Sequence, residues 1–359
     1  MSKLASLAEA LDNPETKKDS KSSTQPVTKK DKFEVLAELN VKLNKQFNVD
    51  VSLVSLGKKV GVKIPSISTN LPTLDDEILQ CGGVPRGRII EVFGPESSGK
   101  TTLALHIVAC EQAATDNLAA FVDAEHALDP NYAAKLGVNV NELLISQPDS
   151  GEQALETVDQ LIDSGAVSLI VIDSVAALVP QAELDGEMGD SNMGLQARLM
   201  SQGMRKLRGK AQTKGVTLIF INQLREKIGV MFGSPEVTTG GKALKFYATV
   251  RLDVRRREII GDKERPIGHK MEIKAVKNKV GSPMRAGRFD LIYGQGLDTA
   301  ADLITCAVAA GVVEKTGAWY SFAGERIGQG LTNAGDCVRV SPELKAAIAK
   351  ALATKKGTT

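Results

Sequence analysis

The chain has 359 residues, of which 42% are hydrophobic and 25% charged, and its formal net charge is +2. These values suit a globular protein of one to three domains, and they leave any nucleic-acid partner to be argued from local clusters of charge. The four cysteines are widely spaced, which argues against a zinc module or a disulfide framework and is typical of a reducing compartment. Neither a signal peptide nor an 18-residue apolar run occurs, so we expect a cytoplasmic protein without a membrane partner.

The N-terminal part divides into a polar stretch and an amphipathic helix. Residues 12–32 are rich in Lys, Ser, Thr and Asp, so we expect residues 1–32 to be a disordered extension. An apolar series with helical spacing follows: Leu36, Leu39, Leu43 and Phe47. This helix either packs on its own domain or docks on another subunit, and the pattern leaves both interpretations open.

From about residue 66, β-rich apolar runs alternate with helical patterns. The runs lie at 88–93, 119–123, 142–146, 168–172, 216–221, 249–254, 270–276 and 288–293. Helical patterns at 101–114, 152–164 and 194–213 separate the earlier runs, which predicts an α/β core over residues 66–298 with a mostly parallel sheet flanked by helices. The later runs follow one another closely, so we expect the sheet to end in antiparallel pairs.

The most specific motif is G-x-x-x-x-G-K-T, which follows the first of these runs. Gly94 and Gly99 let the backbone close around anionic oxygens, Lys100 supplies a cation for the β- and γ-phosphates, and the Thr101 hydroxyl can reach Mg²⁺. The following helix N-terminus also attracts phosphate. The motif predicts a nucleotide site that comprises Gly94, Pro95, Glu96, Ser97, Ser98, Gly99, Lys100, Thr101 and Thr102.

Three other predicted strands end in polar residues, at the edge of the sheet where ligands bind. Asp173 is expected to hold Mg²⁺ through water, although a helix N-cap is the alternative. Glu125 could orient or deprotonate the attacking water, and Gln223 could sense the γ-phosphate. For these two residues the alternative is a capping or edge polar residue.

Two segments have features of a nucleic-acid surface. Residues 193–215 carry six Lys or Arg and no acid, and Arg198 and Arg205 share one helical stripe. A solvated helix is the alternative, although such helices usually mix both signs. Residues 226–245 are rich in Gly and Thr and too long for a simple connection. They predict a loop whose apolar side chains wedge between bases, and an active-site lid is the alternative.

The C-terminal part has a different pattern. Beyond residue 299, two short helical patterns flank turns, and a final helix is predicted at 343–353. We expect residues 299–353 to form a small α+β domain and residues 354–359 a short basic tail.

With these motifs in place, the chain closely resembles the bacterial RecA recombinase family over residues 33–353. The matching stretches are 94–102, 123–130, 171–178, 220–225, 227–233, 239–247, 318–320 and 327–330. The resemblance implies a RecA-type P-loop ATPase core with an N-terminal helix and strand. It also implies a DNA-dependent ATPase that forms a helical filament on single-stranded DNA with ATP and Mg²⁺. Such a filament pairs with homologous duplex, exchanges strands and promotes self-cleavage of a repressor.

The resemblance also implies residue roles in the nucleotide site. Glu125 is the catalytic carboxylate, Gln223 couples the γ-phosphate to the second DNA loop, and Asp129 and Tyr132 contact adenine. The segment 33–65 is implied to dock on a neighbouring subunit. Lys277 and Lys279 reach the phosphates of the nucleotide that this subunit binds, and Lys245 and Phe246 are interface residues.

The two DNA loops implied by the resemblance span about 186–194 and 224–241. The residues that contact DNA are Met193, Arg198, Arg205, Arg225, Ile228, Gly240, Gly241 and Lys242. The chain departs from the family pattern in an N-terminal extension, to about residue 32, that is longer than usual. It also has Asn192 where His is common and Lys242 where Asn or Arg is common. A ring-shaped helicase on the same core and a DNA-binding scaffold without ATP turnover remain as alternatives, and Glu125 disfavours the scaffold.

Family members often end in an acidic tail that restrains DNA binding, whereas residues 354–359 include two lysines and no acid. We therefore expect weak self-restraint. Removal of residues 354–359 should change duplex DNA affinity by less than about twofold, because no repulsion from DNA phosphates is relieved. A filter-binding titration with duplex DNA measures this, and a sharp rise in affinity would contradict the expectation.

Overall fold

The structure, a computed structural model, describes residues 29–47, 63–187, 194–226 and 236–357. The chain divides into two units, Met1–Val62 and Lys63–Thr359. In the first, helix α1 (Lys29–Phe47) includes the last residues of the segment expected to be disordered, because the lysines there are good helix formers. Residues 1–28 of that extension and 48–62 of the linker lie outside the described residues.

The second unit is built on a sheet with the strand order β12-β11-β10-β9-β3-β7-β6-β4-β5. The parallel strands are β3 (Ile89–Gly94), β4 (Leu118–Asp123), β5 (Leu143–Ser146), β6 (Val167–Asp173), β7 (Thr217–Glu226) and the first part of β9 (Val250–Gly261). Three antiparallel strands complete it: β10 (Pro266–Asn278), β11 (Ala286–Ile292) and β12 (Gly296–Leu297). The predicted mostly parallel sheet with an antiparallel end is confirmed.

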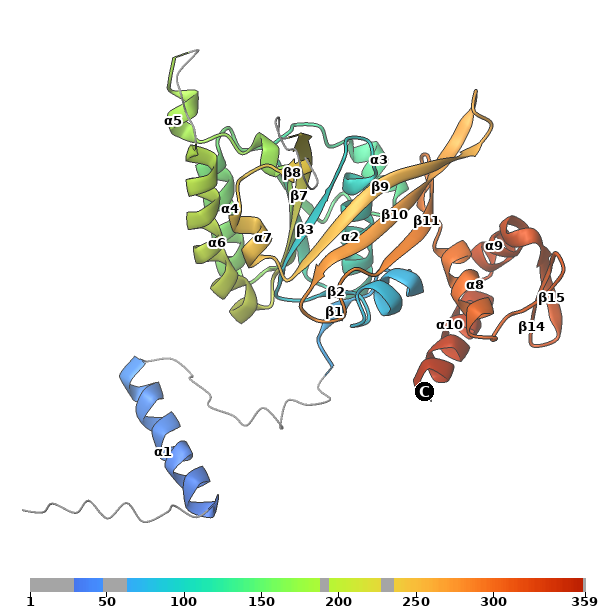
Figure 1. The fold of residues 1–359 in the computed structure, drawn as a ribbon, viewed down its shortest axis with the longest axis horizontal. Coiled ribbons are helices and arrows are strands. Elements are labelled where there is room, and N and C mark those ends of the chain that lie inside the picture. Colours follow the sequence, from blue (N-terminus) through green and yellow to red (C-terminus); the bar gives the residue numbers. More distant parts are fainter. Residues whose placement is uncertain (1–28, 48–62, 188–193, 227–235, 358–359) are drawn as a thin grey trace, which may run out of the picture. The chain divides into compact units, whose positions relative to one another are not determined.

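Helices cover both faces of the parallel strands (Figure 1). Helix α2 (Lys100–Ala114) packs on one face, against side chains such as Phe121 and Val171. On the other face, alternate residues such as Ile172 and Phe220 contact α4 (Gly151–Ser164), α6 (Leu195–Lys214) and α7 (Ala243–Tyr247). Because side chains alternate along a strand, a sheet covered on both faces requires the continuous apolar runs seen in the sequence.

Shorter elements connect this framework. They are β1 (Ser66–Ile67), η2 (Thr73–Ile78), β2 (Val84–Pro85), α3 (Pro130–Lys135), η3 (Val175–Ala177), α5 (Gln181–Leu184) and β8 (Glu236–Thr238). Strands β7, β9 and β10 are longer than their apolar runs. Residues 256–259 of β9 are charged or exposed, yet the ladder with β10 continues through them. Backbone pairing extends these strands where no burial pattern marks them.

The C-terminal part has its own core and packs on η2 of the sheet unit. Its elements are α8 (Thr299–Ala309), β13 (Glu314–Thr316), β14 (Trp319–Phe322), β15 (Glu325–Gln329), α9 (Gly330–Val340) and α10 (Pro342–Gly357). The segment predicted as turns forms a three-stranded antiparallel sheet, β13-β14-β15. Helix α10 continues through most of the expected tail, and Lys356 forms an ion pair with Asp76 of η2 at 2.8 Å.

A buried ion pair links β2, α2 and β6. Arg86 binds both carboxylate oxygens of the fully buried Glu111, at 2.5 and 2.6 Å, and the Ser168 hydroxyl donates to the same carboxylate at 2.6 Å. An Arg86→Ala change should lower the free energy of unfolding by about 3 kcal/mol, since it leaves a carboxylate buried without its cation. Urea titration of the whole chain measures this.

The matched control is Arg288→Ala, which removes an exposed arginine from ion pairs with Glu258 and Glu272. Its cost should be about 1 kcal/mol or less, because water screens such pairs. Equal losses for the two variants would contradict the assignment.

Candidate functional site

The loop between β3 and α2 is shaped as a phosphate cradle. Gly99, at the N-cap of α2, has a φ of +95°. A Cβ on Gly94 would lie 2.0 Å from the carbonyl oxygen of Val254, and one on Gly99 would lie 2.8 Å from Leu291 Cδ1. Both positions therefore require glycine, and the unpaired N–H groups of the first turn of α2 face an incoming anion.

Residues 97–102 line a pocket of about 280 Å³ together with Tyr132, His269, Leu291 and Tyr293. The Ser98 hydroxyl is buried there, and no other described residue forms a hydrogen bond with it. A buried hydroxyl without a partner is costly, and a phosphate oxygen would accept its hydrogen bond. The pocket therefore fits the phosphates of a nucleotide.

Lys100 is buried at the start of α2, and its Nζ donates to the carbonyl oxygen of Pro95 at 2.7 Å. Burial lowers the pKa of its ammonium group, and the carboxylates of Asp173 and Glu125 oppose that effect. The lysine is thus held in the loop beside two acids, where it can neutralise a bound phosphate.

Thr101 and Asp173 lie together beside this loop. The Thr101 hydroxyl donates to Asp173 Oδ2 at 2.7 Å, and burial raises the pKa of that carboxyl to about 6 against the effects of Thr101 and Lys100. In the described part of the chain, no group of three His, Cys, Asp or Glu residues forms a metal site. One hydroxyl and one carboxylate suit Mg²⁺, which takes its other ligands from water and nucleotide phosphates.

Glu125, which follows β4, is shared by two hydrogen-bond donors from neighbouring strand ends. The Ser174 hydroxyl, just after β6, donates to its Oε1, and so does Gln223 Nε2 of β7, at 2.7 Å. The parallel strands thus bring Glu125, Asp173 and Gln223 to the edge that carries the phosphate loop. These are the strand-end residues that the sequence singled out.

Asn222 is a buried junction whose role no sequence motif predicted. Its Nδ2 donates to Glu91 at 3.0 Å and to the carbonyl oxygen of Thr239 at 3.2 Å. Its Oδ1 accepts from the Thr239 hydroxyl at 2.5 Å and from the Gln223 N–H at 2.9 Å. The only signal was an amide at the end of an apolar run. Asn222 ties the end of the 226–245 loop to Gln223.

Gln196 of α6 makes a second junction that the sequence did not reveal. Its Nε2 donates to the carbonyl oxygen of Val175 at 2.9 Å, and its Oε1 accepts from the Gly240 N–H at 3.2 Å. The start of α6, the segment after Asp173 and the end of the second loop are therefore held together.

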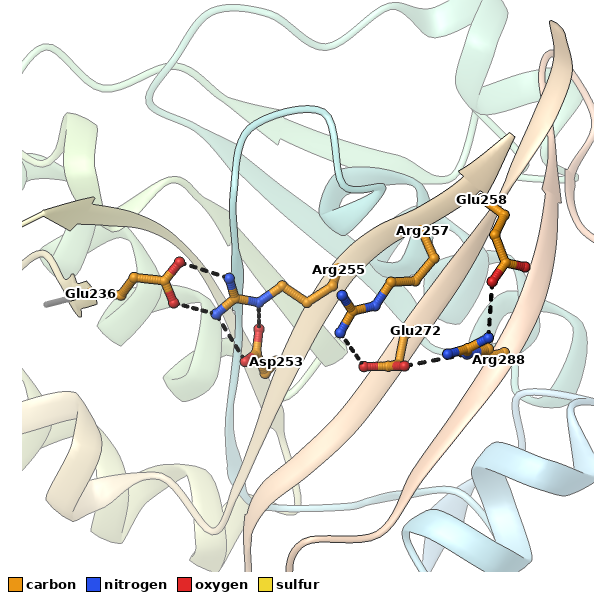
Figure 2. Close-up of polar contacts among 7 residues, drawn as sticks. All are labelled: Glu236, Asp253, Arg255, Arg257, Glu258, Glu272 and Arg288. Carbon is orange, nitrogen blue, oxygen red and sulfur yellow. Dashed lines mark hydrogen bonds and ion pairs between the residues drawn. The ribbon is translucent and has the colours of Figure 1, made fainter. Parts of the chain in front are cut away.

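Strand β8, which lies within the second half of that loop, is clamped to β9 by an arginine fork (Figure 2). Arg255 binds Glu236 through two hydrogen bonds of 2.6 and 2.8 Å and also binds Asp253. Beside this fork, Glu272 bridges Arg257 and Arg288. The fork of Arg255 holds β8 against β9, whereas the bridge of Glu272 joins β9, β10 and β11.

The six cations of the basic segment have different environments. Lys206 binds Glu156 and Asp159 of α4, and Lys210 binds Asp159 and Asp163. The predicted one-signed surface is therefore wrong for these two lysines, because acids from a neighbouring helix neutralise them. Arg198 and Arg205 are exposed, as a DNA-binding role requires.

The other predicted DNA residues lie around the two loops. Arg225 and Lys242 are exposed, and Gly240 and Gly241 have positive φ values of +74° and +76°. Met193 and Ile228 lie outside the described residues. For the adenine contacts, Tyr132 lines the phosphate pocket and shares a hydrogen bond of 2.8 Å with Thr102, whereas the Asp129 side chain caps α3.

Lys277 and Lys279 do not join the phosphate pocket. Asn278, between them, pairs with Val250, which is level with Ile90 at the start of β3. The lysines therefore lie near the opposite edge of the sheet, about 13 Å along β3 from Gly94. There Lys277 Nζ donates to the carbonyl oxygens of Lys245 and Phe246, at 2.5 and 3.0 Å, so three of the four residues predicted to contact a neighbouring subunit form one cluster.

The fold and the strand-end site together define a P-loop nucleotide hydrolase with a RecA-type core. The family model of the RecA N-terminal domain matches residues 34–298, and that of the RecA C-terminal domain matches residues 301–357. The chain belongs to the RecA family and is a recombinase and DNA-dependent ATPase that binds nucleotide and DNA and oligomerises.

Relatives named Protein RecA match most of the chain. That of Kineococcus radiotolerans is 58% identical over 85% of this chain and 87% of its own length. That of Frankia casuarinae is 55% identical over 91% and 94%. The crystal structure of the RadB recombinase, 20% identical, covers 64% of this chain and 98% of its own with a TM-score of 0.50, which supports the fold. None of the described helices is long and apolar enough to cross a membrane.

The raised pKa of Asp173 has a stability consequence. A buried carboxyl with a pKa of about 6, against 3.8 when unperturbed, destabilises the fold above pH 6, and the cost disappears as the pH falls through both values. An Asp173→Asn change should therefore stabilise the nucleotide-free protein by about 2 kcal/mol at pH 7 and weaken Mg²⁺–nucleotide binding. Urea titrations at pH 7 and pH 4 measure this, and a variant less stable at pH 7 would contradict it.

Proposed function

We propose that the chain hydrolyses ATP with Mg²⁺ at a site that two adjacent copies complete, and that DNA controls this site. The observation that carries the proposal is the separation of Lys277 and Lys279 from the phosphate loop of their own copy. A head-to-tail contact can bring one copy's lysines to the next copy's loop, and repetition of such a contact gives a helical filament. Helix α1 and the cluster of Lys245 and Phe246 would contribute to that contact.

Within one copy, the chemistry is divided among the strand ends. Lys100 holds the β- and γ-phosphates, and Glu125 orients and deprotonates the attacking water. Thr101 and Asp173 would hold Mg²⁺, which neutralises charge on the same phosphates. The aromatic ring of Tyr132 and the side chain of Asp129 would contact adenine.

Gln223 would couple hydrolysis to DNA. Its side-chain amide donates to Glu125, and its backbone N–H is linked through Asn222 to the end of the second loop. A γ-phosphate that competes for the side-chain amide would therefore shift that loop. Single-stranded DNA would lie against the two loops and the arginines of α6. The proposed contacts are Met193, Arg198, Arg205, Arg225, Ile228, Gly240, Gly241 and Lys242.

The filament would then pair its strand with homologous duplex and exchange strands. Base pairing would read the sequence while the protein holds the backbones, because the exchange is energetically almost balanced. A self-cleaving repressor is a further partner that we propose from the family resemblance alone. The free cysteines support a reducing compartment such as the cytoplasm.

A Lys100→Arg variant tests the hydrolytic site. It should retain ATP and DNA binding but lose at least about tenfold in DNA-stimulated phosphate release, because an arginine fork cannot replace the compact ammonium in the closed loop. The matched control, Lys135→Arg in α3, should keep full turnover. Unchanged turnover in Lys100→Arg would refute the role of Lys100.

Electron microscopy with single-stranded DNA and a non-hydrolysable ATP analogue tests the assembly. A helical filament should form. Closed rings, together with unwinding of a forked duplex in a separate assay, would instead support the helicase alternative.

A further inference from the structure

A second polar pocket, of about 160 Å³, lies at the edge of the sheet opposite the phosphate loop. Its lining includes residues 87–89 at the start of β3, Arg208 and Gln212 of α6, Tyr247 of α7, and Lys279 after β10. None of the sequence motifs pointed to it, because its residues come from four separate segments.

The pocket gathers three cations, Arg88, Arg208 and Lys279. Among the described residues, no carboxylate forms an ion pair with any of them. Lys206 and Lys210, on the same helix as Arg208, show the contrast, since acids of α4 neutralise both. The guanidinium carbon of Arg208 lies 6.0 Å from the ring centroid of Tyr247, so the ring helps to hold it.

Lys277 adjoins this group. Burial lowers the pKa of its ammonium, and the positive charges of Lys279, Arg251 and Arg208 lower it further, with Glu91 opposing them. Like charges at close range repel, and the repulsion is greatest where water is partly excluded. A bound anion would relieve it, which is the electrostatic signature of a phosphate site.

We propose that this pocket receives the phosphate groups of the nucleotide held by an adjacent copy, with Arg208 as a cation additional to Lys277 and Lys279. The inference rests on the proposed head-to-tail site and extends it. A DNA phosphate is the less favoured occupant, because Arg208 lies ten residues along α6 from Arg198, or about 15 Å. Arg225 and Gly240, the proposed DNA contacts near the two ends of the second loop, do not line the pocket.

An Arg208→Gln variant is the first test. It should lose about tenfold in DNA-dependent ATP turnover, as expected for one charge-assisted contact to phosphate. Lys210→Gln is the matched control on the same helix, and it should change turnover by less than about twofold because α4 already neutralises that lysine. Equal losses in the two variants would overturn the proposal.

Mixed filaments provide the decisive test. Lys100→Arg has an impaired phosphate loop and an intact pocket, whereas Arg208→Gln has the reverse. If Arg208 acts on the neighbour, about a quarter of the sites in a one-to-one mixture combine an intact phosphate loop with an intact pocket. Turnover per copy then exceeds that of either variant alone. If Arg208 acts within its own chain, the mixture stays below Arg208→Gln alone, and the inference is overturned.

A parallel mixture of Lys100→Arg with Lys277→Gln separates this inference from the proposed function. Recovery there without recovery for Arg208→Gln overturns only the role of Arg208, whereas recovery in neither mixture overturns the shared site itself.

The salt dependence of single-stranded DNA binding tests the other occupant. A slope reduced by about one in Arg208→Gln would assign the pocket to a DNA phosphate and overturn the nucleotide assignment.

Discussion

The parallel register of β3, β7, β6 and β4 is the constraint on which the nucleotide site depends. Because these strands run in one direction, their carboxyl ends meet at one edge, where the phosphate loop, Gln223, Asp173 and Glu125 come together. Two apolar layers, one under α2 and one under α4 and α6, hold that register. A slip of one residue would exchange the side chains that face α2 with those that face α4 and α6 and would displace the strand ends, so the same packing specifies the core and the site.

Hydrogen bonds then link this edge to the second of the proposed DNA loops. Glu125 accepts from Ser174 and Gln223, and Asn222 connects Gln223 to Thr239. In the mechanism we propose, a change in charge at the phosphates would alter donors and acceptors at the base of the second loop. The fork of Arg255 holds Glu236, which lies on the same limb of that loop as Thr239.

The antiparallel half of the sheet has the opposite effect. Strand β10 runs against β9, so Lys277 and Lys279 lie at the edge far from the phosphate loop. Topology therefore separates the two halves of the proposed site within one copy, and assembly is the way to unite them. The cations Arg88, Arg208 and Lys279 repel one another in an isolated chain, and under our proposal the phosphates of a neighbour would relieve that repulsion.

The phosphate loop at 94–102, the order of strands and helices, and the polar strand ends at Glu125, Asp173 and Gln223 could be predicted from the sequence alone. These features depend on local backbone geometry and on burial patterns along one segment. The neutralisation of particular cations could be known only from the packed structure, since the partners of Lys206 and Lys210 lie some fifty residues away on α4. The packed structure likewise decided the junctions at Asn222 and Gln196 and the pocket around Arg208. The residue type sets a side chain's charge and hydrogen-bonding capacity, but the partner that satisfies them depends on how distant segments pack.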